Sequence, residues 1–136
     1  MRVYLDSSAL IKRSIVEVES DAFVAALDEH HRAGDFLVSS SLAWVEVTRA
    51  LRTATGGSIA GVAADVDGAL SGVAEYPLTG AVVSLARRVG PNVLRSLDAL
   101  HVATALLVDS DLLLTYDDRL AAACTSGGIL TASPGR

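Results

Sequence analysis

The stretch Arg2–Leu10, RVYLDSSAL, opens the chain with a short apolar run that ends abruptly in a carboxylate. The run Val3–Leu5 has the length and composition of a buried strand. After Asp6, two serines lead into a helical pattern that starts near Ala9. An Asp at this place can cap the helix that follows, or it can present a ligand at the end of the strand. The stretch alone leaves both roles open.

Similar apolar runs recur along the chain and alternate with helical patterns. Strands are predicted at Arg2–Leu5, Phe36–Ser39, Glu75–Pro77, Leu112–Thr115 and Ile129–Thr131. Helices are predicted at Ser8–Arg13, Ser20–Ala33, Ser41–Thr53, Ser58–Ser71, Thr79–Val89, Ser96–Val108 and Asp118–Thr125. The strands are too apolar to face water, so this alternation predicts a three-layer α/β/α fold around a central parallel sheet of about five strands.

Length and composition restrict the class of protein. A chain of 136 residues is sized for a single domain, here residues 1–136. No run reaches the roughly 18 uncharged apolar residues that a membrane span needs, and the N-terminus lacks the pattern of a signal peptide. We therefore expect no contact with a membrane and a cytoplasmic location. Cys124, the single cysteine, excludes an intrachain disulfide and is expected to pack in a helix.

The charge balance is ambiguous about nucleic acid. The net charge of −5 argues against a polyanionic partner. However, ten of the eleven basic residues are arginines, and arginine suits bidentate contact with phosphate. Ordinary surface arginines would give the same count. The arginines near the sequence motifs described below are Arg13, Arg49, Arg52, Arg95 and Arg119.

Acidic residues follow two of the predicted strands. Asp6 follows the first, and Asp117 and Asp118 follow the fourth in LLLTYDDRL. If the sheet is parallel, these strand ends meet at one edge, where ligands of open α/β sheets bind. Asp6 and Asp117 also have a simple structural role as N-caps of the helices that follow.

Two further acids lie inside predicted helices. Glu46 stands between two valines in SLAWVEV, where a fully exposed carboxylate is unexpected, and an ion pair with Arg49 is the structural alternative. In RSLDALHVATAL, Ser96 can cap the helix and Asp98 falls in its first turn, where the helix dipole favours a negative charge. His101 follows three residues later and is expected to be packed or hydrogen-bonded rather than to bind a metal.

Four carboxylates at one edge require neutralisation. Close carboxylates repel one another and resist burial unless a cation is present. Oxygen ligands favour Mg²⁺ or Mn²⁺ over Zn²⁺, and such an ion can polarise a phosphoryl oxygen and activate water. Metal-assisted hydrolysis of a phosphodiester is the resulting hypothesis for Asp6, Glu46, Asp98 and Asp117.

The order of DSSAL, SLAWVEV, RSLDALHVATAL and LLTYDDRL resembles a PIN-domain ribonuclease of the VapC toxin type, from residue 3 to about residue 131. The resemblance implies four acidic metal-site positions at Asp6, Glu46, Asp98 and Asp117, with supporting hydroxyls at Ser8 and Thr115. Asp117 is preferred to Asp118 because it falls two residues after Thr115. Whether Asp118 also joins the site stays open.

The resemblance also implies an activity and partners. It implies RNA cleavage with one or two Mg²⁺ or Mn²⁺ ions, a homodimer, and a VapB-type antitoxin that blocks the cleft. Two alternatives remain. A receiver-like phosphoacceptor domain also gathers acids at strand ends, but it should carry a lysine after the last strand, and the only lysine here is Lys12. An inactive PIN-like protein-binding module is the other, although all four acids are present.

Overall fold

The computed structural model describes all residues from Met1 to Arg136. Five strands form one sheet in the order β3-β2-β1-β4-β5, and every neighbouring pair is parallel. The strands are β1 Arg2–Leu5, β2 Phe36–Ser40, β3 Ala74–Tyr76, β4 Leu112–Leu114 and β5 Leu130–Ala132. The predicted central parallel sheet of five strands is therefore confirmed.

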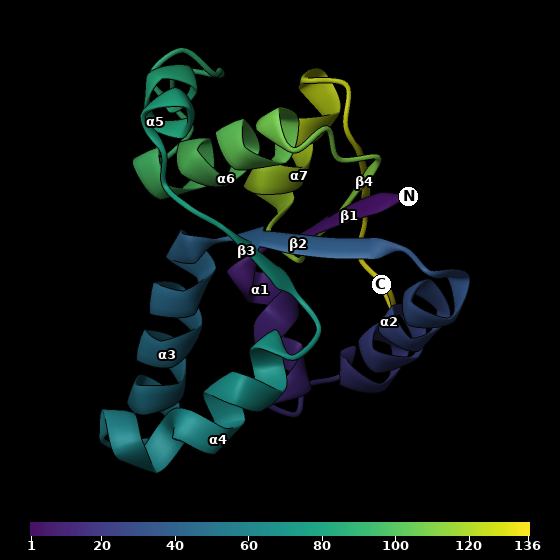
Figure 1. Cartoon of the computed structure of the whole chain (residues 1–136), viewed down its shortest axis with the longest axis vertical. Helices are drawn as coiled ribbons and strands as arrows, with labels where there is room; N and C mark the ends of the chain where they lie inside the picture. The colour runs from purple at the N-terminus through teal and green to yellow at the C-terminus, as the bar shows by residue number, and fades with distance from the viewer.

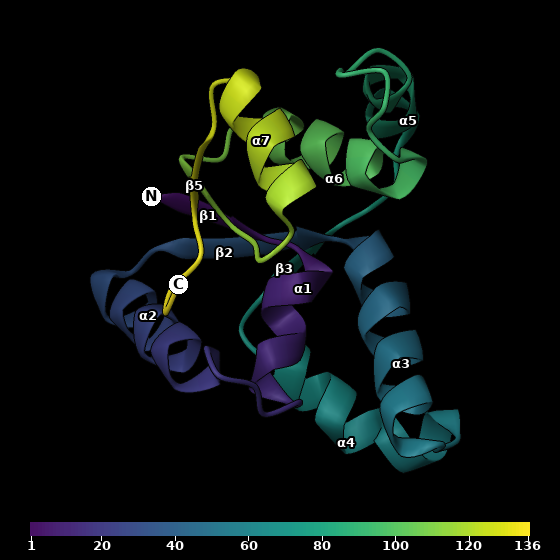
Figure 2. The same ribbon diagram turned by 180° about the vertical axis from the view of Figure 1, so that it is seen from behind.

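Helices cover both faces of this sheet (Figure 1), and the view from behind shows the same separation (Figure 2). One face carries α1 Ser7–Leu10, the 3₁₀ turn η1 Ile11–Arg13, α2 Ser20–Ala33, α3 Ser41–Thr55 and α4 Ile59–Leu70. The other face carries α5 Gly80–Ala86, α6 Ser96–Leu107 and α7 Asp118–Ser126. The three-layer α/β/α prediction is thus confirmed. None of these helices combines the length and apolar composition that crossing a membrane requires.

Some predicted boundaries differ from the structure. The helix predicted to reach Val89 ends at Ala86, because the last turn tightens and the Arg88 amide bonds to the Leu85 carbonyl. The prediction that Ser96 caps its helix is wrong. Ser96 is already the first residue of α6, and Arg95 stands at the cap position without a side-chain capping bond.

The two sheet faces bury different residues of the same strands. Val3 and Leu5 pack into the cluster on the α1–α4 side, whereas Tyr4 between them packs into the cluster on the α6–α7 side. In β4, Leu114 and Leu113 divide in the same way. Successive strand residues point to opposite faces, so an apolar run without polar alternation supplies both cores.

The topology fixes the place of the site. From β1 the chain adds β2 and then β3 on one side, and later adds β4 and β5 on the other side of β1. The strand order therefore changes direction between β1 and β4. In open α/β sheets, ligands bind outside the carboxyl ends of the strands at such a switch point. Asp6 and Thr115 directly follow these two strands.

Truncation of the central strand tests this packing. Leu5→Ala should lower the free energy of unfolding by about 2–5 kcal/mol, because Leu5 is fully buried and leaves a cavity. Ile59→Ala, at a position that is 66% exposed, should change it by less than about 0.5 kcal/mol. Urea denaturation of both variants measures the difference. Equal losses would contradict the assignment of Leu5 to the core.

Candidate active site

Asp6 lies at the carboxyl end of β1 and accepts three hydrogen bonds. Ser8 Oγ and the Ala9 amide donate to Oδ1 at 2.7 and 3.0 Å, and Thr115 Oγ1 donates to Oδ2 at 2.7 Å. Burial raises the pKa of Asp6, although these hydrogen bonds oppose that effect. The Ala9 contact is the N-cap bond of α1. The capping role left open by the sequence is therefore real, and it occupies only one of the two carboxylate oxygens.

The two hydroxyls that donate to Asp6 are themselves held by the loop after β4. The Tyr116 amide donates to Ser8 Oγ at 2.9 Å, and the Asp117 amide donates to Thr115 Oγ1 at 3.0 Å. Each hydroxyl accepts from a backbone amide and is left to direct its own hydrogen at Asp6. The ends of β1 and β4 are locked together by these side chains and amides.

Asp117 and Asp118 have different surroundings. Asp117 caps α7, and its Oδ1 accepts from the amides of Arg119 and Leu120 at 2.9 and 3.2 Å. The Asp118 side chain is 90% exposed and pairs with Arg136 at 2.8 Å. Asp117 is thus the member of the doublet that belongs to the loop network around Asp6.

An open pocket of about 550 Å³ lies beside this loop and contains both Asp98 and Asp117. Asp98 lies in the first turn of α6, as the sequence indicates. Burial raises the pKa of Asp98, and the negative charges of Asp117 and Glu46 raise it further, against the lowering effects of His101 and Arg95. The residues that line the pocket are Ser8, Arg95, Asp98, Tyr116, Asp117, Asp118 and Arg119.

Glu46 reaches the same region from α3, on the other face of the sheet. Its Oε1 lies 2.6 Å from His101 Nε2 on α6, and the other ring nitrogen of His101 lies 2.6 Å from the Tyr4 hydroxyl. No bond to Arg49 forms, so the alternative of an ion pair within α3 gives way to a bond between helices on opposite faces. His101 is 2% exposed, in agreement with the expectation that it is hydrogen-bonded in the interior.

The four predicted acids occupy one region without forming a closed shell of ligands. No group of three or more Asp, Glu, His or Cys side chains is close enough to hold one metal ion. Asp6 and Glu46 do not line the pocket that contains the other two. The donor chemistry nevertheless suits a hard divalent cation, since all four offer carboxylate oxygens. In addition, the charges of Asp117 and Glu46 disfavour the ionised form of Asp98.

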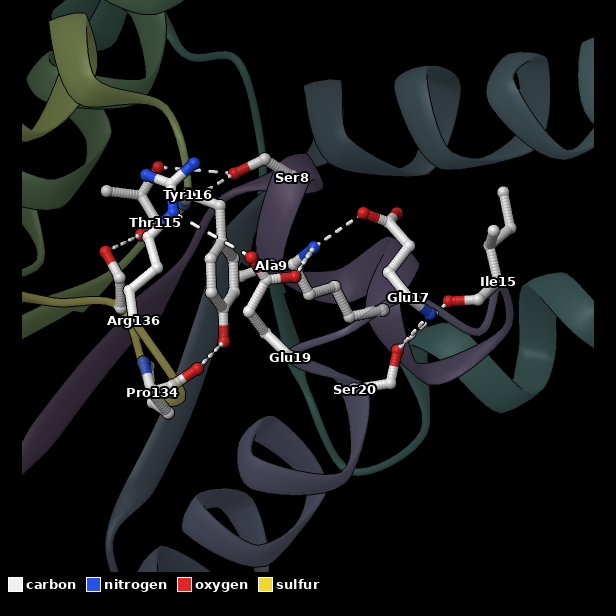
Figure 3. A network of polar contacts seen from close by, with 12 residues as sticks. Ser8, Ala9, Ile15, Glu17, Glu19, Ser20, Thr115, Tyr116, Pro134 and Arg136 are labelled. Carbon is white, nitrogen blue, oxygen red and sulfur yellow. Dashed lines mark hydrogen bonds and ion pairs between the residues drawn. The ribbon is translucent and has the colours of Figure 1, made fainter.

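A second network fixes Tyr116, which lines the pocket between Thr115 and Asp117. Its hydroxyl donates to the Pro134 carbonyl at 2.7 Å, and Figure 3 shows this contact together with Arg136 beside the ring. Lys12 Nζ lies 4.4 Å from the ring centroid and also pairs with Glu17 at 2.7 Å. The Tyr116 ring is therefore held in place next to the loop that lines the pocket.

Comparison with known proteins identifies the fold family. Residues 3–125 match the model of the PIN domain. The chain belongs to the PIN-domain family. Two relatives from Mycobacterium tuberculosis match nearly their full length: Ribonuclease VapC47 is 38% identical over 98% of this chain and 97% of the relative. Ribonuclease VapC46 is 40% identical over 97% of each chain.

Solved structures share the PIN fold at low sequence identity. VapBC2 from Rickettsia felis, bound to a DNA fragment from its promoter, aligns with a TM-score of 0.77 at 11% identity and covers 98% of this chain and 99% of that one. VapC20 from M. tuberculosis, a toxin that cleaves the sarcin–ricin loop, aligns with a TM-score of 0.75 at 13% identity. The alignment covers 97% of this chain and 99% of that one. The predicted family and fold are confirmed.

Sequence reasoning missed the part that Tyr4 and His101 play in this PIN domain. His101 is one helical turn after Asp98, which is the only sequence signal that it faces the site. Its partners Tyr4 and Glu46 are distant in sequence and come from β1 and α3. Only the tertiary structure brings the three together.

The raised pKa of Asp98 predicts a pH dependence of stability without metal. The folded state binds a proton at Asp98 more tightly than the unfolded chain, so the free energy of unfolding falls as pH rises from about 4 through the higher folded pKa. Asp98→Asn removes this loss. In EDTA, the variant should therefore gain stability relative to wild type as pH rises, measured by urea denaturation at pH values of about 4 and 7. A difference independent of pH would contradict the account.

Proposed function

We propose that this PIN domain is a metal-dependent ribonuclease that hydrolyses RNA phosphodiester bonds and acts as the toxin of a toxin–antitoxin pair. The main observation behind this proposal is the acidic pocket at the switch point between β1 and β4. There the negative charges of Asp117 and Glu46 raise the pKa of Asp98. Relatives named as VapC ribonucleases, 36–40% identical over almost the whole chain, support the same activity.

Asp6, Glu46, Asp98 and Asp117 are the proposed ligands of Mg²⁺ or Mn²⁺, and VapC ribonucleases of the PIN family generally depend on a divalent metal. The ion supplies charge neutralisation, polarisation of the phosphoryl group and activation of water. Ser8 and Thr115 orient Asp6 through the hydrogen bonds described above. Asp117 remains fixed by the amides of α7.

Arg95 and Arg119 are proposed to hold RNA phosphates. Both are exposed, both line the acidic pocket, and neither forms an ion pair in the structure. The other arginines near the motifs are placed differently: Arg13 donates to carbonyls at the end of α4, at 3.0 Å to Ala69 and 2.7 Å to Ser71. Two free guanidinium groups beside carboxylates suit a phosphate chain whose scissile group lies among the acids.

A VapB-type antitoxin is the proposed inhibitor, and the protein is proposed to act as a cytoplasmic homodimer. The aligned VapBC2 structure supports the choice of partner. An acidic pocket of this kind attracts a guanidinium, which gives such a partner a way to block it.

The receiver-like alternative is excluded by membership of the PIN family, and the only lysine is buried against Glu17 and Glu19.

Removal of Asp98 should abolish cleavage. Asp98→Asn is expected to slow cleavage of purified bacterial RNA by at least about 100-fold in Mg²⁺, because a metal ligand and a charge are lost. EDTA should stop the wild type. Asp67→Asn, an exposed acid on α4, is the matched control and should cleave like wild type. Equal cleavage and equal growth inhibition by wild type and Asp98→Asn would overturn the proposed function.

Loss of the two arginines should weaken RNA binding without changing the site itself. Arg95→Ala and Arg119→Ala should each raise KM about tenfold and lower the salt dependence of RNA affinity by about 0.7–1 in log–log slope, with kcat little changed. Arg52→Ala, in a separate pocket at the end of α3, should have no effect. An unchanged slope in both pocket variants would show that they do not contact phosphate.

A further inference from the structure

Two hydrogen bonds hold the Tyr4 hydroxyl in the interior. The Ser40 amide donates to the Tyr4 hydroxyl at 3.3 Å, and this hydroxyl lies 2.6 Å from His101 Nδ1. Burial strongly raises the pKa of Tyr4, so the hydroxyl keeps its hydrogen. The hydroxyl is therefore held between the Ser40 amide and the His101 ring.

His101 joins Tyr4 to Glu46. Its Nδ1 faces the Tyr4 hydroxyl and its Nε2 faces the Glu46 carboxylate. Nε2 lies 2.6 Å from Glu46 Oε1, and an ionised carboxylate can only accept. The chain of bonds therefore leads from Ser40 through Tyr4 and His101 to one oxygen of Glu46.

The His101 ring is held in place by packing in the interior. Tyr4 is fully buried, His101 is 2% exposed, and their rings meet edge to face with centroids 5.9 Å apart. Glu46 differs, because its side chain is 27% exposed and reaches in from a helix of the opposite layer. Its Oε1 is bonded to His101, whereas its Oε2 has no hydrogen-bond partner in the protein. The buried His101 ring thus holds one oxygen of a partly exposed acid.

We infer that Tyr4 and His101 are positioning residues: His101 holds one oxygen of Glu46 so that the other is presented to a divalent cation, and Tyr4 holds His101. This inference rests on the proposed function, since it gives Glu46 a metal to meet. Residues that orient metal ligands through hydrogen bonds typically change metal affinity or activity about 10- to 100-fold when substituted. In this arrangement, His101 on α6 and Tyr4 on β1 fix the orientation of Glu46 on α3.

Mn²⁺ affinity, measured by isothermal titration calorimetry, tests the inference apart from catalysis. His101→Leu should weaken Mn²⁺ binding about 10- to 100-fold, and Tyr4→Phe should weaken it less. In a Glu46→Gln background, His101→Leu should have no further effect, because His101 acts only through that carboxylate. Thr104→Val is the matched control, a fully buried polar residue on the same helix that bonds only to the Leu100 carbonyl, and it should leave Mn²⁺ affinity unchanged.

The outcomes separate this inference from the proposed function. If Glu46→Gln weakens Mn²⁺ binding and His101→Leu does not, the positioning role is wrong and the metal site stands. If His101→Leu weakens Mn²⁺ binding equally with and without Glu46→Gln, His101 acts independently of Glu46, and the positioning role is again wrong. If Glu46→Gln leaves Mn²⁺ affinity unchanged, both this inference and the assignment of Glu46 as a ligand fail.

The two ring nitrogens of His101 give a readout that needs neither metal nor a stable leucine variant. Nitrogen NMR of the metal-free protein should show the ring hydrogen on Nε2 in wild type. In Tyr4→Phe, which loses only the hydroxyl, the Nδ1 signal should shift, because this nitrogen loses its hydrogen-bond partner. A wild-type ring protonated on Nδ1 alone, or signals unaffected by Tyr4→Phe, would contradict the inference.

Discussion

The repulsion between carboxylates at the carboxyl edge of β1 and β4 is the constraint on which the site depends. A parallel sheet brings these strand ends together, and helices from both faces add Glu46 and Asp98 to the same region. This repulsion disfavours the ionised form of Asp98, whose pKa is raised by burial and by its acidic neighbours. An arrangement that disfavours its own charges without a cation is the physical basis for proposing a metal.

The protein restrains these acids with donors that also have structural roles. Asp6 caps α1 with one oxygen and accepts from Thr115 with the other, and Asp117 caps α7. Capping and ligand presentation are therefore compatible roles for one side chain, because a carboxylate has several lone pairs to share. In the same way, Ser8 and Thr115 both lock the two strand ends together and support Asp6.

Much of this fold follows from the sequence, because the strands are short apolar runs and the helices between them carry clear start signals. The order of the strands in the sheet is beyond such reasoning, since the apolar runs carry no information about which strand lies beside which. At the site, the structure distinguishes the two members of the doublet Asp117-Asp118: Asp117 caps α7, whereas Asp118 is exposed and pairs with Arg136. The bond between Glu46 and His101 could not be predicted from the sequence, because the two residues lie 55 positions apart and local periodicity favours Arg49 instead.

The central claim, that four carboxylates at this edge hold a divalent cation, is tested most directly by anomalous diffraction from crystals grown with Mn²⁺. We expect an anomalous peak within coordination distance of oxygens from Asp6, Asp98 and Asp117, with Glu46 directed toward it while still bonded to His101. A peak bound by other residues, or no peak at this edge in crystals whose pocket is open to solvent, would contradict it.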